Sequence, residues 1–131
     1  LKVTLGEKAC FDFAWFNKPA SRIPEALWLG FNPIKPLTAI TKLGVQVDPK
    51  NVISDGNREM HFVNGNIYFE DIALEAVDLP LLSIDKPCAY SFLNEIPRCD
   101  KGVWFNQFNN QWGTNFPMWY EGDGRFRYIL S

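Results

Sequence analysis

The sequence predicts an all-β domain, a β-sandwich built from short and mostly antiparallel strands. Apolar side chains recur at every second position in several runs, and Phe11, Phe13 and Trp15 give the clearest example. This alternation is the side-chain period of a strand with one buried face. The runs are short and are separated by Gly, Pro and Asn, which is typical of sandwiches. No run carries an apolar helical stripe longer than about three turns.

The first half of the chain contains strand-like runs bounded by proline and glycine. Leu1, Val3 and Leu5 alternate as though the chain begins within a strand. Residues 17–24 contain two prolines and are expected to form a loop. The expected strands are residues 11–15, 26–32, 45–47 and 52–53, while residues 37–43 could form a strand or one helical turn that ends at Gly44.

The second half contains the clearest hairpin signal of the chain. Asn64–Gly65 separates residues 60–63 from residues 66–69, and this dipeptide supplies the positive φ angles of a tight primed turn. A further turn is expected at residues 122–124, where Asp stands between two glycines. The remaining expected strands are residues 72–77, 79–84, 89–93, 104–108 and 125–130.

Length and composition predict a single domain that spans residues 1–131. A chain of 131 residues buries roughly two thirds of its unfolded surface, which is enough for one core. The net charge of −2 argues against a general nucleic-acid binder. No apolar run approaches the roughly 18 residues of a membrane span. The start does not resemble a signal peptide and lacks an initiator Met, so the chain is expected to be processed or cut from a larger protein.

The three cysteines do not form a metal-binding or disulfide pattern. Cys10, Cys88 and Cys99 are an odd number and no two of them have Cys-x-x-Cys spacing. One bridge between Cys88 and Cys99 stays open as an alternative. The pattern leans toward a reducing compartment such as the cytoplasm without settling the localisation.

No residue set in the sequence has the pattern of a catalytic centre. His61 is the single histidine, and no nucleophile stands near it in the sequence, so a structural or solvated role is expected. Glycosidases commonly use two carboxyl groups, and Glu121 and Asp123 are the best nominees. We prefer turn chemistry and pairing with Arg125 or Arg127 for these two acids. The sequence therefore predicts no catalytic residue, metal site or cofactor in this chain.

The segment from residue 104 to residue 128 is the most informative part of the sequence, because it mixes large rings with uncharged amides. Rings offer apolar faces to C–H groups, and amides both donate and accept hydrogen bonds, which suits a neutral, hydroxyl-rich ligand such as a sugar. The same mixture could pack one β-domain against another. Within residues 109–117, Gly113 and Pro117 also allow an irregular buried loop whose backbone the amides satisfy.

Three stretches resemble a known family. Residues 15–33, 42–63 and 105–130 are similar to the C-terminal part of a family of large microbial proteins related to the α-mannosidases of glycoside hydrolase family 38. The resemblance implies a parent several times longer, with an N-terminal catalytic domain that holds zinc through His and Asp and uses an Asp nucleophile. It implies that this tail is a β-sandwich packed near that site. None of those catalytic motifs is present here.

The resemblance also implies a candidate ligand-binding set, by analogy with a C-terminal β-domain of the α-mannosidases that lends a loop to the sugar pocket. The candidate residues are Asn109, Asn110, Trp112, Asn115 and Trp119, with Glu121 beside them. Our leading hypothesis is a non-catalytic domain that packs against the catalytic domain of the parent and completes its mannose-type sugar site. The alternatives are an independent carbohydrate-binding module, a structural or homo-oligomerisation domain, and a small enzyme that uses Glu121 or Asp123.

Overall fold

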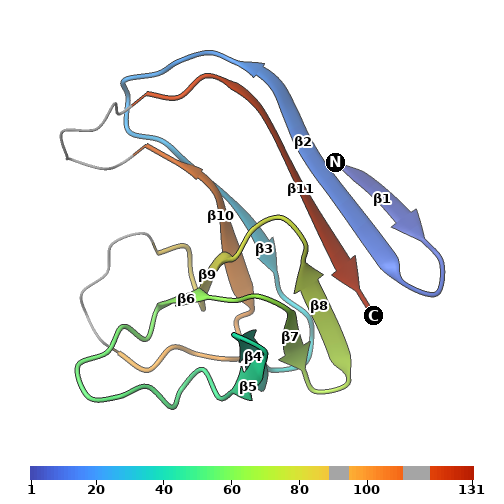
Figure 1. Cartoon of the computed structure of the whole chain (residues 1–131), viewed down its shortest axis with the longest axis vertical. Helices are drawn as coiled ribbons and strands as arrows, with labels where there is room; N and C mark the ends of the chain where they lie inside the picture. Colours follow the sequence, from blue (N-terminus) through green and yellow to red (C-terminus); the bar gives the residue numbers. More distant parts are fainter. Residues whose placement is uncertain (89–94, 111–118) are drawn as a thin grey trace.

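The chain folds as a β-sandwich of two antiparallel sheets, which confirms the predicted fold class. The computed structural model describes residues 1–88, 95–110 and 119–131 (Figure 1). The large sheet has the order β1 (Lys2–Leu5), β2 (Ala9–Lys18), β11 (Gly122–Leu130), β8 (Ile72–Ala76), β7 (Asn66–Phe69), β4 (Ala39–Lys42) and β5 (Val45–Val47). The small sheet has the order β3 (Ala26–Phe31), β10 (Val103–Asn109), β9 (Leu81–Ile84) and β6 (Met60–Phe62).

The core lies between the two sheets and is made of the alternate residues of facing strands. Strand β7 illustrates the rule, because Ile67 and Phe69 are fully buried while Tyr68 between them is only half-buried. The fully buried apolar side chains are Ile40, Ile67, Phe69, Leu74, Leu82, Val103, Phe105 and Tyr128. Burying one such side chain contributes about 1.5–3 kcal/mol, so this layer supplies much of the driving force for folding.

A cluster of rings joins the two sheets beside the aliphatic core. Phe31 of β3 lies 5.4 Å from Phe11 of β2 and 5.1 Å from Tyr128 of β11, measured between ring centroids. Phe105 of β10 lies 4.9 Å from Tyr128. Tilted and edge-to-face pairs at these distances add about 0.5–1.5 kcal/mol each beyond their burial. These contacts place β2 and β11 directly opposite β3 and β10.

The hairpin predicted at Asn64–Gly65 is wrong, because the chain crosses there from the small sheet to the large one. Strand β6 pairs with β9, whereas β7 pairs with β8 and β4. The side-chain oxygen of Asn64 accepts a hydrogen bond from the Leu43 backbone N–H at 2.5 Å. The backbone N–H of Asn64 donates to the Thr41 carbonyl at 3.1 Å. The crossing puts Val63 and Ile67, both buried, on opposite walls of the core.

The tight primed turn occurs instead between β4 and β5. Leu43 and Gly44 have φ angles of 50° and 80°, and Lys42 pairs directly with Val45. Positive φ at both central residues is the signature of the two-residue turn that matches strand twist. Of the two alternatives for residues 37–43, the strand is the correct one, because residues 39–42 form β4 and no helical turn is present there.

Two further local predictions are wrong. Residues 52–53 lie in a segment without strand structure between β5 and β6. Residues 122–124 are the start of β11 and do not form a turn, because Gly122 and Gly124 pair with Lys18 and Trp15 of β2. A Cβ added at Gly124 would lie 2.1 Å from the Trp15 ring, so the glycine is there to admit the indole. The predicted strand at residues 89–93 lies outside the described residues.

Candidate functional site

The ring-rich end of the sandwich is the candidate site. We use this name for the surface formed by Trp15, Phe16, Leu27, Phe108, Trp119 and Tyr120. It lies where β2 and β10 end and where β3 and β11 begin, at the upper left of Figure 1. Two β-bulges shape this surface, and Lys18 connects the segments that form it.

The first bulge lies in the pairing of β2 with β11. Lys18 pairs with Gly122 and Trp15 with Gly124, so Phe16 and Asn17 together oppose Asp123. Asn17 adopts a left-handed φ of 53°, and its N–H donates to the Asp123 carboxylate at 2.8 Å. Because one extra residue on a strand re-aims the side chains beyond it, the Phe16 ring points into solvent and is 72% exposed.

The second bulge lies in the pairing of β10 with β3. Asn106 pairs with Trp28 and Phe108 with Leu27, which leaves Gln107 as the extra residue. Residues that pair directly share a face, so Phe108 joins Leu27 on the side that faces β2. Gln107 itself is buried and donates to the Tyr128 hydroxyl.

Tyr128 and Gln107 form a buried polar contact beneath the ring-rich end. Burial raises the pKa of Tyr128 to about 12, and the hydrogen bond from Gln107 opposes that rise. A neutral phenol is therefore held in the core across the physiological range. This contact holds Gln107, the extra residue of the second bulge, in the core, because a buried phenol and a buried amide each need a hydrogen-bond partner.

Lys18 ties the parts of the ring-rich end together. Its ammonium lies 2.5 Å from the Glu25 carboxylate and 4.4 Å from the centroid of the Phe108 ring. It also donates to the Tyr120 carbonyl at 3.2 Å. The charge is thus neutralised by a carboxylate, a ring face and a carbonyl, each from a different segment.

Two rings form the rim of this surface. Trp119 and Tyr120 are 46% and 50% exposed. The Arg22 guanidinium lies over the Trp119 ring at 4.7 Å, and Tyr120 lies 5.7 Å from Phe108 with the ring planes at 37°. The rim is therefore amphipathic, with a planar cation on one ring and a tilted ring pair beside it.

A hollow of about 400 Å³ lies beside Phe108. Its walls are mostly apolar and come from the end of β2, the start of β3 and β10. The residues that matter most are Trp15, Phe16, Lys18, Glu25, Leu27 and Phe108. The indole N–H of Trp15 is buried and has no hydrogen-bond acceptor among the described residues. The apolar walls of the hollow suit a small neutral group with an apolar face.

The predicted ligand-binding residues take different places. Asn110 is buried: its side-chain oxygen accepts from the Glu25 N–H at 2.6 Å, and its amide nitrogen lies 3.2 Å from the carbonyls of both Ser21 and Ile23. Its amide is therefore used to hold the 19–25 loop against β10. Asn109 is half-buried and pairs with Ala26.

The remaining predicted positions are exposed or outside the described structure. Trp119 is on the rim, and Glu121 is exposed next to it. Trp112 and Asn115 lie outside the described residues. Of the six predicted positions, the structure thus brings Asn109, Asn110 and Trp119 to the ring-rich end or its supporting loop.

Sequence reasoning missed Phe16, Lys18 and Leu27. One signal was available, because Trp15 and Phe16 are adjacent rings in a run that otherwise alternates. Two neighbouring large apolar residues in such a run indicate a bulge or a second buried surface. Nothing in the sequence indicated that Lys18 would meet Phe108, since the two are brought together only by the sheet packing.

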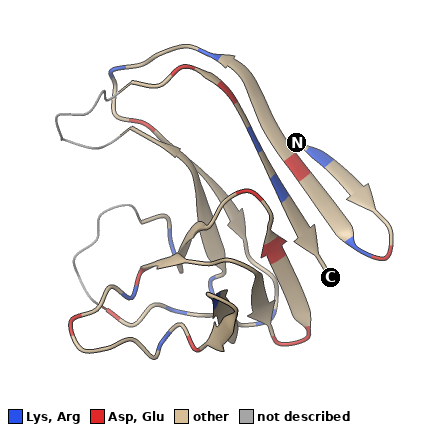
Figure 2. Cartoon of the chain, in the orientation of Figure 1, with Lys and Arg blue, Asp and Glu red and all other residues tan. Residues whose placement is uncertain are grey.

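The carboxylates near the C-terminus pair differently from the prediction. Asp123 accepts from Asn17, whereas Arg125 bonds Asp12 at 2.6 Å and Arg127 bonds Asp78 at 2.8 Å. These pairs lie on the outer face of the large sheet, where Figure 2 shows charges of both signs on β2 and β11. The hydrogen bonds from the two arginines lower the pKa of both Asp12 and Asp78.

A second polar cluster surrounds His61, which is buried as a structural histidine. His61 Nε2 lies 2.9 Å from the Arg58 carbonyl and donates to it, so Nδ1 accepts from Lys42 at 3.0 Å. Burial lowers the pKa of His61, and the nearby Lys42 charge lowers it further. The tautomer is thereby fixed and the ring is held neutral.

All three cysteines lie in the described residues and carry thiols, so the alternative of a bridge between Cys88 and Cys99 is excluded. The Cys88 thiol lies 3.6 Å from the Glu59 carboxylate, and both residues are buried. Within the described ranges, no three His, Cys, Asp or Glu side chains are grouped so that they could hold a metal ion. The described residues contain no helix that could span a membrane.

Comparisons of the chain with protein-family models, curated proteins and solved structures gave no match.

Proposed function

We propose that this chain is a non-catalytic β-sandwich domain of an α-mannosidase-like glycoside hydrolase, and that its ring-rich end packs against the catalytic domain. One observation carries the proposal: Phe16 and Leu27 are exposed at one apolar hollow, and Tyr120, exposed beside Trp119, packs against Phe108 in the wall of that hollow. Contiguous apolar surface of this kind marks interaction sites.

The chemistry of the surface supports a protein partner. Interfaces are enriched in Trp, Tyr, Phe and Arg, and their centres are depleted of other charges. The ring-rich end has Arg22 on Trp119, and its Lys18 charge is already neutralised by Glu25. An uncharged surface of a neighbouring domain with complementary shape could therefore cover the ring-rich end without leaving a buried charge unpaired. The resemblance of residues 105–130 to the mannosidase-related family is what identifies the partner.

Binding between this chain and the separately produced catalytic domain of the parent tests the proposal. Trp119→Ala or Tyr120→Ala is expected to weaken binding roughly tenfold or more, because exposed rings become hot spots when covered. Phe62→Ala is the matched control, since Phe62 is also about half exposed but lies on β6 at the far edge of the small sheet. Equal affinities for all three variants and the unaltered chain would reject the proposal. Hydrolysis of an aryl mannoside by the isolated chain, abolished by Glu121→Gln, would reject its non-catalytic part.

A carbohydrate-binding module is the second candidate, and the hollow favours it. A space of about 400 Å³ whose mostly apolar lining includes Trp15 and Phe108 suits one sugar ring. Titration with mannose-containing oligosaccharides by calorimetry separates the two candidates. Heat that is lost in Phe108→Ala and kept in Phe62→Ala supports the module. No heat at millimolar sugar removes it.

A further inference from the structure

Strand β3 is unpaired along its outer edge. It is the first strand of the small sheet and pairs only with β10; on its other side the described residues contain no strand. An unpaired edge presents a row of backbone N–H and C=O groups that can bond to another extended segment. In β3 this row runs along six residues.

This edge lacks the features that normally protect edge strands. Natural edges are short or carry charged residues, especially lysine, or proline. The other three edges follow the rule, because β5 and β6 have three residues each and β1 carries Lys2. Strand β3 has the sequence ALWLGF, and Figure 2 shows no charge along it. A long, wholly uncharged and apolar edge indicates that it is covered in the working protein.

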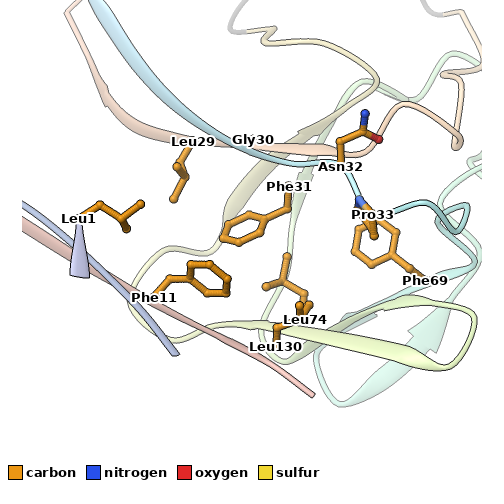
Figure 3. Close-up of a pocket in the computed structure, with 10 residues that line it drawn as sticks. All are labelled: Leu1, Phe11, Leu29, Gly30, Phe31, Asn32, Pro33, Phe69, Leu74 and Leu130. Carbon is orange, nitrogen blue, oxygen red and sulfur yellow. The ribbon is translucent and has the colours of Figure 1, made fainter. Parts of the chain in front are cut away.

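An apolar cavity of about 340 Å³ lies beside the same edge. Figure 3 shows Phe11 and Leu130 of the large sheet and Leu29 and Phe31 of β3 around one space, with Leu1 at its margin. The hollow at the ring-rich end continues along the same strand, since it is lined by Leu27. The inward-facing residues of β3 therefore border two apolar spaces in succession.

The two sheets differ in extent on this side of the molecule. Phe11 of β2 contacts Phe31 of β3, so β2 lies opposite β3, and β1 extends one strand further. Val3 pairs with Phe11 and shares its face, yet Val3 and Leu5 are 47% and 79% exposed. No described strand of the small sheet lies opposite β1. The gap beside β3 is therefore as wide as one strand.

We propose that β3 is completed by one additional β-strand, an uncharged extended segment of a partner polypeptide with apolar side chains at alternate positions. Its backbone bonds the free edge of β3, and its apolar side chains enter the cavity beneath β1 and the hollow beside Leu27. Such β-augmentation draws affinity from main-chain hydrogen bonds and specificity from pockets for alternate side chains. The inference goes beyond the proposed function, because it concerns the backbone edge of β3, although it shares the hollow beside Leu27 with the ring-rich end.

A second copy of this chain is a poor occupant. Two copies paired side by side through β3 would have both large sheets on the same side. Each large sheet extends beyond its β3 by β1, so the β1 of one copy would meet the β2 of the other. A single slender strand avoids this collision.

The test screens the chain against a random library of peptides about ten residues long, which is enough to span β3. Enriched peptides are expected to carry apolar residues at every second position and to slow amide hydrogen exchange in residues 26–31. Leu27→Lys is expected to weaken binding roughly tenfold or more, since it places a charge at one of the two apolar spaces. Leu43→Lys is the matched control, because Leu43 is exposed on the β4–β5 turn.

The outcomes separate this inference from the proposed function. Peptide binding that survives Trp119→Ala supports the β3 edge whether or not the rings bind a catalytic domain. The inference is overturned if no peptide is enriched, if enriched peptides lack alternation, or if exchange slows elsewhere. It is equally overturned if sedimentation detects a dimer with residues 26–31 protected and no peptide bound. If Leu27→Lys fails to fold, amide hydrogen exchange in residues 26–31 of the unaltered chain, measured with and without peptide, still tests the inference.

Discussion

The half of the sandwich around β4, β7, β8 and β9 is closed, whereas the side along β3 and the ring-rich end is open. In the closed half Ile40, Ile67 and Leu74 are fully buried and belong to the same apolar cluster as Leu82 of the other sheet. On the open side the same kinds of residue stay half exposed, as Leu27 does. The difference does not come from residue type. It comes from whether a second layer is present, because among the described residues the small sheet ends at β3 while the large sheet continues to β1.

The comparison also shows how local irregularity creates surface. Within the described ranges, no register shift interrupts the pairings of β4, β7, β8 and β9 in the closed half. The two bulges, at Phe16–Asn17 and at Gln107, both lie toward the open end. Each turns a ring out of the regular pattern. Five changes, taken in order of expected effect, test this division into a closed core and an open, ring-bearing side.

The largest effect is expected from Leu74→Ala in the closed half. Removing a fully buried leucine leaves a cavity and should lower the free energy of unfolding by about 2–5 kcal/mol. Leu43→Ala is the control, and it should change stability by less than about 0.5 kcal/mol because Leu43 is exposed. Denaturant unfolding measures both. Equal small losses would show that the closed half is not the main core.

The next effect is expected at the boundary, from Gly124→Val. The added side chain would meet the Trp15 ring, and its Cβ alone would lie 2.1 Å away, so a loss of about 1–3 kcal/mol is expected. Gly6→Val is the matched control, because the nearest atom to its Cβ is 3.9 Å away. If the two variants unfold at the same denaturant concentration, the indole does not pack on the glycine.

Tyr128→Phe removes the buried hydroxyl that Gln107 binds, and should cost about 1–3 kcal/mol by leaving the amide underbonded. The raised pKa gives a second readout. Below about pH 10 the phenol is neutral in both states. As pH rises from there through about 12, the unfolded chain loses its proton first, so stability falls. Ultraviolet titration should show this tyrosine ionising last, and ordinary ionisation would contradict its burial.

His61 should make the closed half sensitive to acid. Its pKa is lowered by burial and by Lys42, so the unfolded chain binds the proton first as pH drops below about 6.5. The stability that its neutral ring contributes is full above that pH and is lost as pH falls through the lower folded pKa. His61→Gln should flatten the stability profile below about pH 6.5, whereas Lys42→Met should only reduce its slope. An unchanged profile in His61→Gln would disprove the role.

The smallest effect is expected on the open side. Phe16→Ala removes a large ring that is mostly in water, so stability should change by no more than about 0.5 kcal/mol. Phe69→Ala, which removes a fully buried ring of the same kind, should cost about 3–5 kcal/mol. Thermal unfolding of the two variants compares the sides directly. A large loss in Phe16→Ala would mean that this ring belongs to the core.

Local features of the fold were predictable where they depend on neighbouring residues. Alternation identified the strands around Phe13 and Phe126, because period two is imposed by the backbone itself. Turn chemistry was less reliable. Asn64–Gly65 has the composition of a hairpin turn, yet the hairpin forms at Leu43–Gly44, because strand partners and not the dipeptide decide which turn is needed.

The candidate site was predictable in part. The sequence pointed to the ring-bearing segment and to Trp119, and the structure places that residue on the rim. It did not show that the Asn110 amide would be used to hold the 19–25 loop. It also gave no sign of Lys18, whose partners are separated from it by up to about one hundred residues.

The sequence by itself determined that this protein is built of strands, since side-chain period and turn residues act within a few positions. Only the tertiary structure decided which strands pair, which rings remain in water and where one sheet stops short of the other. Those outcomes depend on contacts between distant segments, and burial is set by the presence of a facing layer that no local stretch encodes.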